Sequence, residues 1–348
     1  MTALSADRPD TSRVAIVIVN YRTPALTMRC LAALRGERNL VPNLKVIVVD
    51  GGSDDASPKL LAAGIDGPEY RGWVSFLPLD LNGGFGWANN QAILGLAADD
   101  DPPDYVHLLN PDTEITAGAV LALVQEMQGH ARCGAAGSQL LTKKGEVAAS
   151  AFRFPSPGRE FINAARSEKL GRLLGIASTV VRASGSAEVD WVSGASVLFR
   201  AEALRDAGLF DDGFFLYFEE VELMHRLRAS GWKTRHVPAS RVVHAEGAST
   251  GLVVNRTTAF PAYWYQSRRR YFALTGGLAR ALGASLSWLA GRALGKVKDV
   301  ARGSQAASAA RARDVLRTGL LPSRRDILPA VPAWGDPPGR PPAWMTRG

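Results

Sequence analysis

The stretch Tyr105-Val-His-Leu-Leu109, followed by Asn110-Pro111-Asp112, decides how this chain folds. The mostly apolar run is long enough for one buried strand. Pro111 ends that strand, because proline has no backbone N–H for a sheet and keeps its predecessor out of helical conformations. We therefore expect Asp112 at the carboxyl end of a strand, where open α/β sheets bind their ligands. Its carboxylate suits either a divalent cation shared with a diphosphate or an ordinary helix cap.

Two earlier segments repeat the pattern of a buried strand, a polar loop and a helix. Val14–Val19 and Val46–Val49 are apolar on both faces, as in central strands of parallel sheets. Helical patterns follow them, the first beginning at Thr23-Pro24. The order predicts an α/β fold with a Rossmann-like, mostly parallel sheet flanked by helices.

The segment Gly83-Gly84-Phe85-Gly86 lies just before the helical pattern of residues 91–98. Glycines let a backbone approach a ligand closely and lead it to a helix N-terminus. Their spacing matches neither a P-loop nor the dinucleotide fingerprint expected after the first strand. A dinucleotide-dependent oxidoreductase is therefore disfavoured.

The positive charge of the chain is concentrated near its end. The net charge is +8, but residues 261–348 hold 15 Arg and Lys against 4 Asp, which is +11. Residues 1–260 therefore carry −3, which indicates an anionic surface as partner and no nucleic acid. The polar N-terminus and the absence of a long uncharged apolar run lead us to expect a cytoplasmic protein. Cys30 and Cys133 are too few for a disulfide framework.

Three carboxylates lie together in Glu219-Glu220-Val221-Glu222, at the start of a predicted helix. Favourable interaction with the helix dipole explains them without any catalytic role, and Arg226 is spaced to pair with Glu222. The apolar run before them favours burial, which raises a carboxylate pKa toward the value that suits a general base. Because Glu220 lies about 100° round the helix from Glu219, only one or two of them can reach a common site.

As an ordered set, these segments resemble glycosyltransferase family 2. The resemblance covers roughly residues 13–272 and includes Val48–Ser53, Leu109–Asp112, Trp191–Ala195 and the segment from Phe215 to His244. It is nearest to the rhamnosyltransferase-like enzymes of bacterial surface polysaccharide assembly. The resemblance implies an inverting enzyme of the GT-A fold that uses a nucleotide sugar.

The resemblance also implies roles for individual residues. Glu220 would be the catalytic base, and Asp112 and His244 would hold Mn²⁺ or Mg²⁺. The residues implied to bind the nucleotide are Asn20, Thr23, Asp50, Asn89 and Asp112. Those implied to form the acceptor or sugar pocket are Trp191, Gly194 and Glu219. The metal motif here is Asn110-Pro111-Asp112, which lacks the first acid of an Asp-x-Asp.

The C-terminal part reads as an extension of the catalytic domain. Within residues 273–320, Leu278, Leu282, Leu286, Leu289, Ala293, Val297 and Val300 form one helical stripe. Arg280, Lys298 and Arg302 lie opposite that stripe, and Arg292 and Lys296 lie beside it. The pattern predicts an amphipathic helix at a membrane interface, with packing on the catalytic domain as the alternative. Residues 321–348 are rich in Pro, Gly and Arg, which predicts a disordered tail.

The expected function combines these readings. The chain would transfer L-rhamnose from dTDP-rhamnose to a polyprenyl-diphosphate-linked glycan, at the inner face of the cell membrane. One alternative is a transferase of the same family that uses a UDP-hexose. The other is a catalytically silent scaffold that binds nucleotide sugars without turnover.

Overall fold

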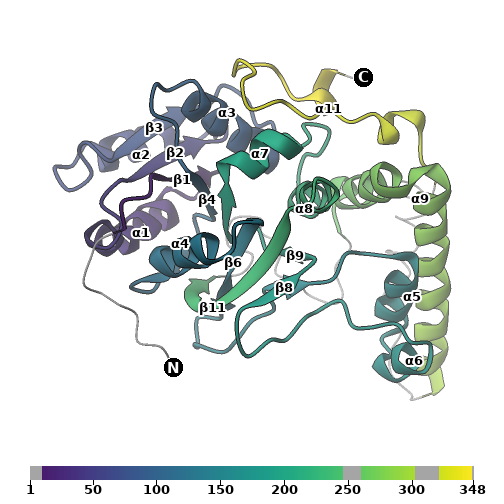
Figure 1. The fold of residues 1–348 in the computed structure, drawn as a ribbon. Helices are drawn as coiled ribbons and strands as arrows, with labels where there is room; N and C mark the ends of the chain where they lie inside the picture. The colour runs from purple at the N-terminus through teal and green to yellow at the C-terminus, as the bar shows by residue number, and fades with distance from the viewer. Residues whose placement is uncertain (1–9, 246–259, 302–320, 347–348) are drawn as a thin grey trace.

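The structure is a computed structural model that describes residues 10–245, 260–301 and 321–346. Over these residues its centre is a nine-stranded sheet in the order β3-β2-β1-β4-β10-β6-β11-β5, with β8 paired to β11 (Figure 1). The strands are β1 (Val14–Asn20), β2 (Leu44–Asp50), β3 (Val74–Pro78), β4 (Tyr105–Leu109), β5 (Thr113–Ile115), β6 (Cys133–Leu141), β8 (Ala187–Val189), β10 (Ser196–Arg200) and β11 (Lys233–His244).

Six of these nine strands point in the same direction. β2 and β4 are parallel to β1, and β3 is parallel to β2. β10 is antiparallel to both β4 and β6, so β6 has the direction of β1, and β11 is parallel to β6. β5 and β8 run opposite to β11. The predicted α/β fold with a mostly parallel sheet is therefore confirmed.

Helices cover both faces of the sheet, which explains why the central strands are apolar on both sides. The helices on one face are α1 (Pro24–Leu34), α2 (Ser57–Ile65) and α4 (Ala119–Gly129), with the 3-10 helix η1 (Arg35–Asn39) after α1. Those on the other face are α3 (Phe85–Ala97), α7 (Ala201–Ala207) and α8 (Glu219–Ala229). Each face has its own buried cluster, so the core lies in two layers around the sheet.

The segment between β6 and β8 forms a smaller unit beside the sheet (Figure 1). Its parts are β7 (Ala151–Phe152), which pairs with β9 (Trp191–Val192), α5 (Pro157–Ala165) and α6 (Glu168–Leu173). The sequence predicts an irregular excursion for residues 152–187, and the structure instead contains these two helices. The hydroxyl of Ser156 caps α5 by accepting from the Arg159 N–H, a local signal compatible with helix formation.

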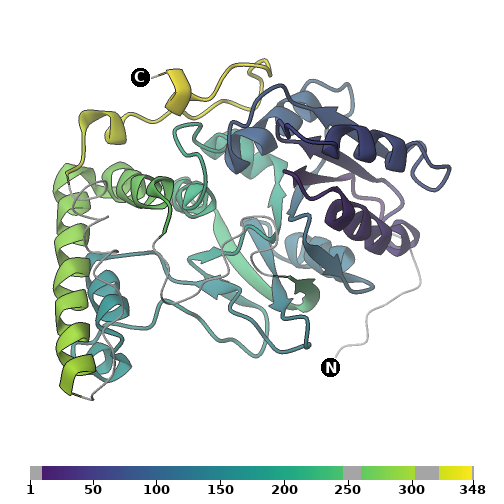
Figure 2. The ribbon, with the colours of Figure 1, turned by 180° about the vertical axis from the view of Figure 1, so that it is seen from behind.

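The helix α9 (Ala262–Ala301) changes direction at Gly276 and Gly277, where the backbone is not helical. Its first part is packed against the sheet domain, and its second part runs along α5 (Figure 2). The close approach to α5 requires small residues, because a side chain at Gly291 would overlap the Phe161 carbonyl. The break lies near the boundary predicted between residues 272 and 273, but that division into domains stays a prediction.

The C-terminal segment differs from the predicted disorder. Residues 321–346 cross the outside of the sheet domain and include η3 (Arg324–Ile327) and α11 (Ala343–Thr346) (Figures 1 and 2). Backbone groups connect it to the loop before α8: Leu209 donates to Pro332, and Asp212 donates to Ala330. A composition rich in Pro and Gly excludes a core of its own, but it leaves backbone groups free to bind another surface.

A buried ion pair connects the loop before α8 to α9. Arg270 donates to both carboxylate oxygens of Asp211 at 2.7 and 2.9 Å, and both side chains are buried. We expect Asp211→Ala to lower the free energy of unfolding by about 3–5 kcal/mol, because it leaves a buried guanidinium without its partner.

The matched control for this variant is Glu188→Ala, which breaks the exposed Lys233–Glu188 pair of similar length (2.8 Å). Exposed pairs contribute about 0–1 kcal/mol, so its unfolding curve in urea should hardly shift. Equal shifts for the two variants would contradict the assignment of Arg270 and Asp211 as a structural link.

Candidate active site

A cavity of about 770 Å³ opens at the carboxyl ends of the central parallel strands. Tyr21, Gly51 and Asn110, which follow β1, β2 and β4, contribute to its wall. Six of the ten residues predicted for the site line this cavity: Asp112, Trp191, Gly194, Glu219, Glu220 and His244. They come from four separate segments of the chain, which the fold brings together at one edge of the sheet.

The pairing of β5 with β11 places Asp112 beside His244. His244 is opposite Thr113 in this antiparallel ladder, and the Ala245 N–H donates to the Asp112 carbonyl at 3.0 Å. The His244 Nε2 atom consequently lies 3.2 Å from Asp112 Oδ1. The two side chains approach each other because their backbones are paired.

The surroundings of Asp112 fit a metal ion. Its side chain is buried, and neither carboxylate oxygen accepts a hydrogen bond from the residues that the structure describes, although the His244 Nε2 atom lies 3.2 Å from Oδ1. A buried carboxylate without donors is costly unless a cation neutralises it, and carboxylate and imidazole both bind Mn²⁺. The described residues contain no group of three or more Asp, Glu, His or Cys side chains placed to hold an ion. The protein would therefore supply two ligands here, and diphosphate oxygens and water would supply the others.

The first turn of α8 presents two carboxylates to the cavity. Glu219 is buried and Glu220 is partly exposed, and one oxygen of each lacks a hydrogen-bond partner within the described chain. The residues before them, Tyr217 and Phe218, have positive φ angles of 70° and 69°. Such strain is uncommon for aromatic residues and is concentrated at functional sites. The strained loop directs the helix start toward the cavity.

The third carboxylate of this turn has a structural role. Glu222 accepts from the Arg226 Nε at 2.8 and 2.9 Å, which is the helix pair that the spacing predicts. Arg226 also donates to the Leu209 carbonyl at 2.6 Å. The acidic turn is therefore divided, with Glu219 and Glu220 in the cavity and Glu222 in a salt bridge.

Burial raises the pKa of the Glu219 carboxyl well above its ordinary value, and the nearby charge of Glu220 adds to this effect. Burial also raises the pKa of Glu220, opposed by its own N–H and by those of Val221 and Gly194. A raised pKa in the folded state favours the protonated form. The contribution of these two carboxyls to the stability of the fold is therefore fully present at low pH and is lost as the pH rises through the folded-state pKa. Ionised Glu220 is correspondingly a stronger base than an ordinary glutamate.

Aromatic rings form a further wall of the cavity. Trp191 is stacked on Phe152 with 4.2 Å between ring centroids and an interplanar angle of 18°. Tyr217 and Tyr263 are also stacked and line the same cavity. Flat apolar faces of this kind suit a sugar ring. Sequence reasoning missed Phe152, Tyr217 and Tyr263. The aromatic run before α8 was a signal for Tyr217, but only the path of α9 places Tyr263 here.

The structure does not bring the four other predicted nucleotide residues to the cavity wall. Asn20 is fully buried, donates to Asp50 at 2.7 Å and accepts from the backbone N–H and hydroxyl of Thr23. Asp50 also accepts from Ser53. This network holds the ends of β1 and β2 together behind Gly51. Asn89 is buried in α3 and donates to the carbonyl of Phe85, the residue at the start of that helix.

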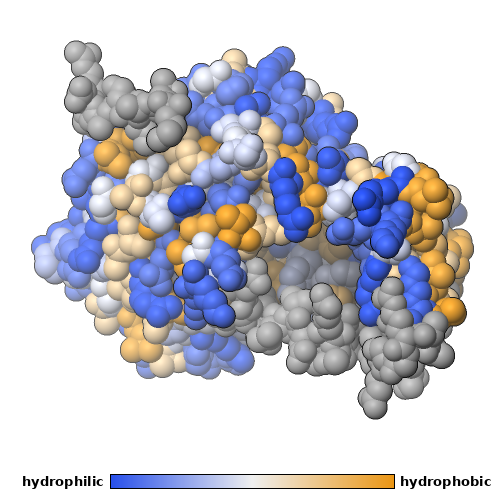
Figure 3. All heavy atoms as spheres, turned by 90° about the horizontal axis from the view of Figure 1, so that it is seen from below, coloured by the Kyte–Doolittle hydropathy of each residue, from blue (hydrophilic) through white to orange (hydrophobic). Residues whose placement is uncertain are grey.

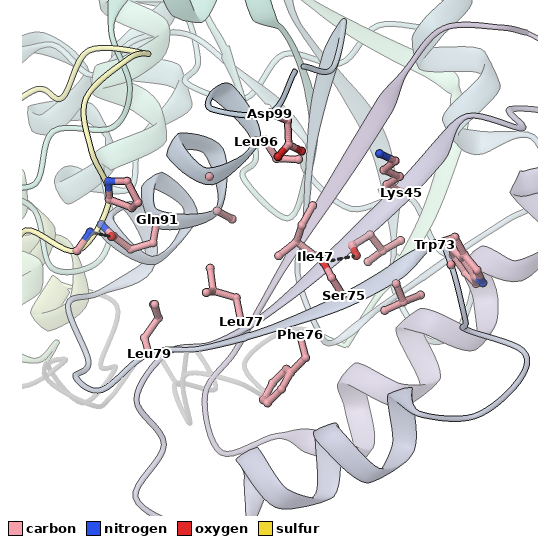
Figure 4. A pocket seen from close by; sticks show the side chains of 17 residues that line it. Lys45, Ile47, Trp73, Ser75, Phe76, Leu77, Leu79, Gln91, Leu96 and Asp99 are labelled. Atoms are coloured by element: carbon pink, nitrogen blue, oxygen red, sulfur yellow. Dashed lines mark hydrogen bonds between the residues drawn. The ribbon is translucent and has the colours of Figure 1, made fainter. Parts of the chain in front are cut away.

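A second cavity, of about 750 Å³, lies along the edge strand β3 and the helix α3 (Figure 4). Most of its lining is apolar, and Lys45 and Asp99 are the only charged residues among those that line it. Gln91 faces it from α3 and accepts from the Gly339 N–H at 2.6 Å. It shares no lining residue with the first cavity and contains neither a carboxylate pair nor a histidine. The candidate chemistry therefore lies in the first cavity.

Comparison with known proteins agrees with this site. Residues 15–173 match the family model "Glycosyl transferase family 2", and residues 105–294 match "Glycosyl transferase family group 2". The mannosyltransferase PcManGT from Pyrobaculum calidifontis, solved with GDP-Man and Mn2+, has a similar fold with a TM-score of 0.52. It is 16% identical in sequence, and the match covers 89% of this chain and 82% of that one.

Two curated relatives are rhamnosyltransferases. The N-acetylglucosaminyl-diphospho-decaprenol L-rhamnosyltransferase of Mycobacterium tuberculosis (strain H37Rv) is 31% identical over 263 residues, which are 69% of this chain and 78% of that protein. Rhamnosyltransferase WbbL of Escherichia coli (strain K12) is 28% identical over 173 residues, or 46% of this chain and 60% of that one. The chain belongs to glycosyltransferase family 2, and it has the GT-A fold of that family.

Proposed function

We propose that this glycosyltransferase moves L-rhamnose, with inversion, from dTDP-rhamnose to a polyprenyl-diphosphate-linked glycan in polysaccharide biosynthesis. The observation that carries the proposal is one cavity that contains both the Asp112–His244 pair and the carboxylate of Glu220. Direct displacement at a sugar carbon is assisted by a base that takes the acceptor proton and by a cation that stabilises the leaving diphosphate. The names of the two curated relatives support rhamnose as the sugar.

In the proposed reaction, Glu220 acts on the acceptor. Its carboxylate takes the proton of the attacking hydroxyl, and the hydroxyl oxygen forms a bond to the anomeric carbon. The bond from that carbon to the diphosphate oxygen breaks on the opposite face, and its electron pair leaves with the nucleoside diphosphate. A metal held by Asp112 and His244 would supply Lewis-acid stabilisation to that diphosphate. Trp191 and Gly194 would orient the acceptor, because a sugar packs on a flat ring and against exposed backbone.

The four residues outside the cavity wall have a narrower proposed role. Asn20 and Thr23 would act through Asp50, which they hold in place behind Gly51. Asp50 would accept a hydrogen bond from the pyrimidine base once the nucleotide is bound. Asn89 would act on the nucleotide through the start of α3, where it bonds the Phe85 carbonyl.

The first prediction concerns the donor and the metal. In a panel of nucleotide sugars with Mn²⁺ or Mg²⁺, dTDP-rhamnose should give the highest turnover with a polyprenyl-diphosphate-linked acceptor. Asp112→Ala and His244→Ala should each lower that turnover by about 10²-fold or more, because leaving-group stabilisation by a metal is worth several kcal/mol.

His130→Ala is the control for loss of a histidine, since His130 is exposed at the end of α4 and does not line the cavity. Its metal titration should match that of the unaltered protein. Full activity of Asp112→Ala and His244→Ala in EDTA would refute the metal assignment. A higher turnover with a UDP-hexose would identify that hexose, and not rhamnose, as the donor sugar. Binding of nucleotide sugars without any turnover would favour a catalytically silent scaffold.

The second prediction distinguishes the two carboxylates. Glu220→Gln should lower kcat by roughly 10²–10⁴-fold with little change in donor affinity, because the amide keeps the shape but cannot accept the proton. Glu219→Gln is the matched variant and should have the smaller effect on kcat. It should also raise the melting temperature at neutral pH, since it removes an ionisable group whose pKa is raised by burial.

The pH profile provides a second measurement for the same residues. Activity should rise with pH through a value above 4.5, the ordinary pKa of glutamate, because burial raises the pKa of Glu220. In Glu219→Gln this acid limb should stay in place, because Glu219, whose pKa is raised further, is still uncharged where Glu220 ionises. The opposite order of severity for the two variants would identify Glu219 as the base.

We also propose that residues 273–320 hold the enzyme on an anionic membrane, through the second part of α9. No helix in the described ranges is long and apolar enough to span a membrane. Small residues, Gly291 and Gly295, lie where this part of the helix packs on α5. Leu278 of the leucine stripe packs against the core, whereas Leu286 and Val297 are left outward, 52% and 66% exposed. Apolar side chains gather at this end of the molecule in Figure 3.

The basic residues of this helix are divided by the structure. Arg280 faces inward and donates to the Thr275 carbonyl at 2.8 Å, so it is not available to a membrane. Lys296, beside the stripe, and Lys298, opposite it, stay partly exposed. Arg302 lies outside the residues that the structure describes. Each basic residue near an anionic surface contributes about 1 kcal/mol, so a salt-sensitive attraction adds to the apolar contact.

The third prediction tests this face with vesicles of anionic phospholipid. The double variant Leu286→Gln/Val297→Gln should bind them at least about tenfold more weakly, because burial of such side chains contributes about 1.5–3 kcal/mol each. Turnover of a soluble short-chain acceptor should not change. Leu60→Gln replaces a leucine that is 56% exposed on α2 and should bind as the unaltered protein does. Equal binding by all three proteins would show that the stripe does not contact the membrane.

A further inference from the structure

The C-terminal tail reaches the wall of the active-site cavity from outside. The Trp344 indole N–H donates to the Gly83 carbonyl at 2.9 Å. Its ring packs edge-to-face with the ring of Phe215, with 5.1 Å between the ring centroids. Gly84 and Phe215 both line the cavity, whereas Trp344 does not. Trp344 therefore contacts two wall segments, the glycine turn and the aromatic loop before α8, without contacting what the cavity would hold.

These two wall segments depend on each other for their position. The Phe85 N–H donates to the Phe215 carbonyl at 3.1 Å. Gly84 has a φ angle of +92°, and a side chain there would overlap that same carbonyl. A side chain at Gly83 would overlap the ring of Trp87. The turn thus lies between Trp87 on one side and the tail on the other, and the Gly84 N–H also donates to the Asn82 side chain at 3.1 Å.

The tail is anchored along its length as it approaches this point. The Trp87 indole N–H donates to the Arg340 carbonyl at 2.8 Å, and the Gly339 N–H donates to Gln91 at 2.6 Å. Both partners lie on α3, the helix that begins at the glycine turn. The segment before Trp344 is therefore bound to α3, and this contact brings Trp344 next to Gly83.

A sequence of ring contacts continues from Trp344 into the cavity. Phe215, which Trp344 contacts, meets Tyr263 at 5.3 Å between ring centroids, and Tyr263 is stacked on Tyr217. All three of these inner rings line the cavity. Removing the outermost ring leaves the inner ones without support from the solvent side.

We propose that residues 339–346 act as a brace for the active site and that Trp344 is a positioning residue within it. The brace orders the glycine turn and the aromatic loop before substrate arrives, so that binding does not have to order them. The inference rests on the proposed function only in taking this cavity as the site of sugar transfer. The variants are therefore measured both with and without turnover.

The experiment compares three full-length variants. Trp344→Ala removes the hydrogen bond and the ring, and Trp344→Phe removes only the hydrogen bond. Trp334→Ala is the matched control, because Trp334 is a partly buried tryptophan of the same tail that stacks against Arg205 of α7 instead. Amide hydrogen exchange is followed at residues 82–86 and 213–217, together with kcat and KM for the nucleotide sugar.

In Trp344→Ala, exchange should accelerate at both segments, and kcat/KM should fall by about tenfold, as expected when positioned groups are loosened. Trp344→Phe should show a smaller change of the same kind. Trp334→Ala should leave exchange at both segments and kcat/KM unchanged, even where its melting temperature falls as much. Equal exchange in Trp344→Ala and the unaltered protein would overturn the brace. Absence of turnover in every protein, with faster exchange only in the Trp344 variants, would overturn the proposed function and leave the brace standing.

Discussion

The pairing of β5 with β11 is the constraint on which the candidate site depends. It places Asp112 and His244 side by side through backbone hydrogen bonds, so their separation does not rely on attraction between the side chains. The same pairing buries the Asp112 carboxylate at the strand ends, where it accepts no hydrogen bond from the described residues. A buried anion of this kind is unfavourable unless a cation neutralises it. The sheet therefore holds the two proposed metal ligands in place by its own backbone hydrogen bonds.

A similar arrangement exists at α8. Glu219 and Glu220 lie next to each other in a largely buried position, and the loop that precedes them is strained at Tyr217 and Phe218. Burial and mutual repulsion oppose ionisation, so folding loses stability as the pH rises. Structures keep such unfavourable groups only where their surroundings hold them firmly. Glu222 of the same turn is also buried, but it has the salt bridge with Arg226 that Glu219 and Glu220 lack.

Much of this could be predicted from the sequence, and the exceptions have physical causes. Asp112 was predictable because a proline ends its strand, and strand ends of a parallel sheet share one edge. Glu220 enters the cavity and Glu222 does not, and this depends on the direction in which α8 starts. The periodicity of the sequence does not determine that direction. Asn20 is polar at a strand end, but its amide binds Asp50 and not the cavity. The disorder predicted for the tail differs from the structure for another reason. Composition describes only the contacts that a segment can make within itself, whereas the tail contacts α3 and the loop before α8.

These contacts cross the boundary predicted near residue 272 between the catalytic domain and its extension. Arg270 of α9 binds Asp211 just before the aromatic loop and also donates to the Leu328 carbonyl in the tail. Tyr263 comes from the first turn of α9 and lines the cavity, while Trp344 lies against its wall from outside. A division of the chain near residue 272 separates these groups in sequence although they meet at one loop. Described residues on both sides of the predicted boundary therefore contact the loop before α8, and the second part of α9, beyond Gly277, runs along α5.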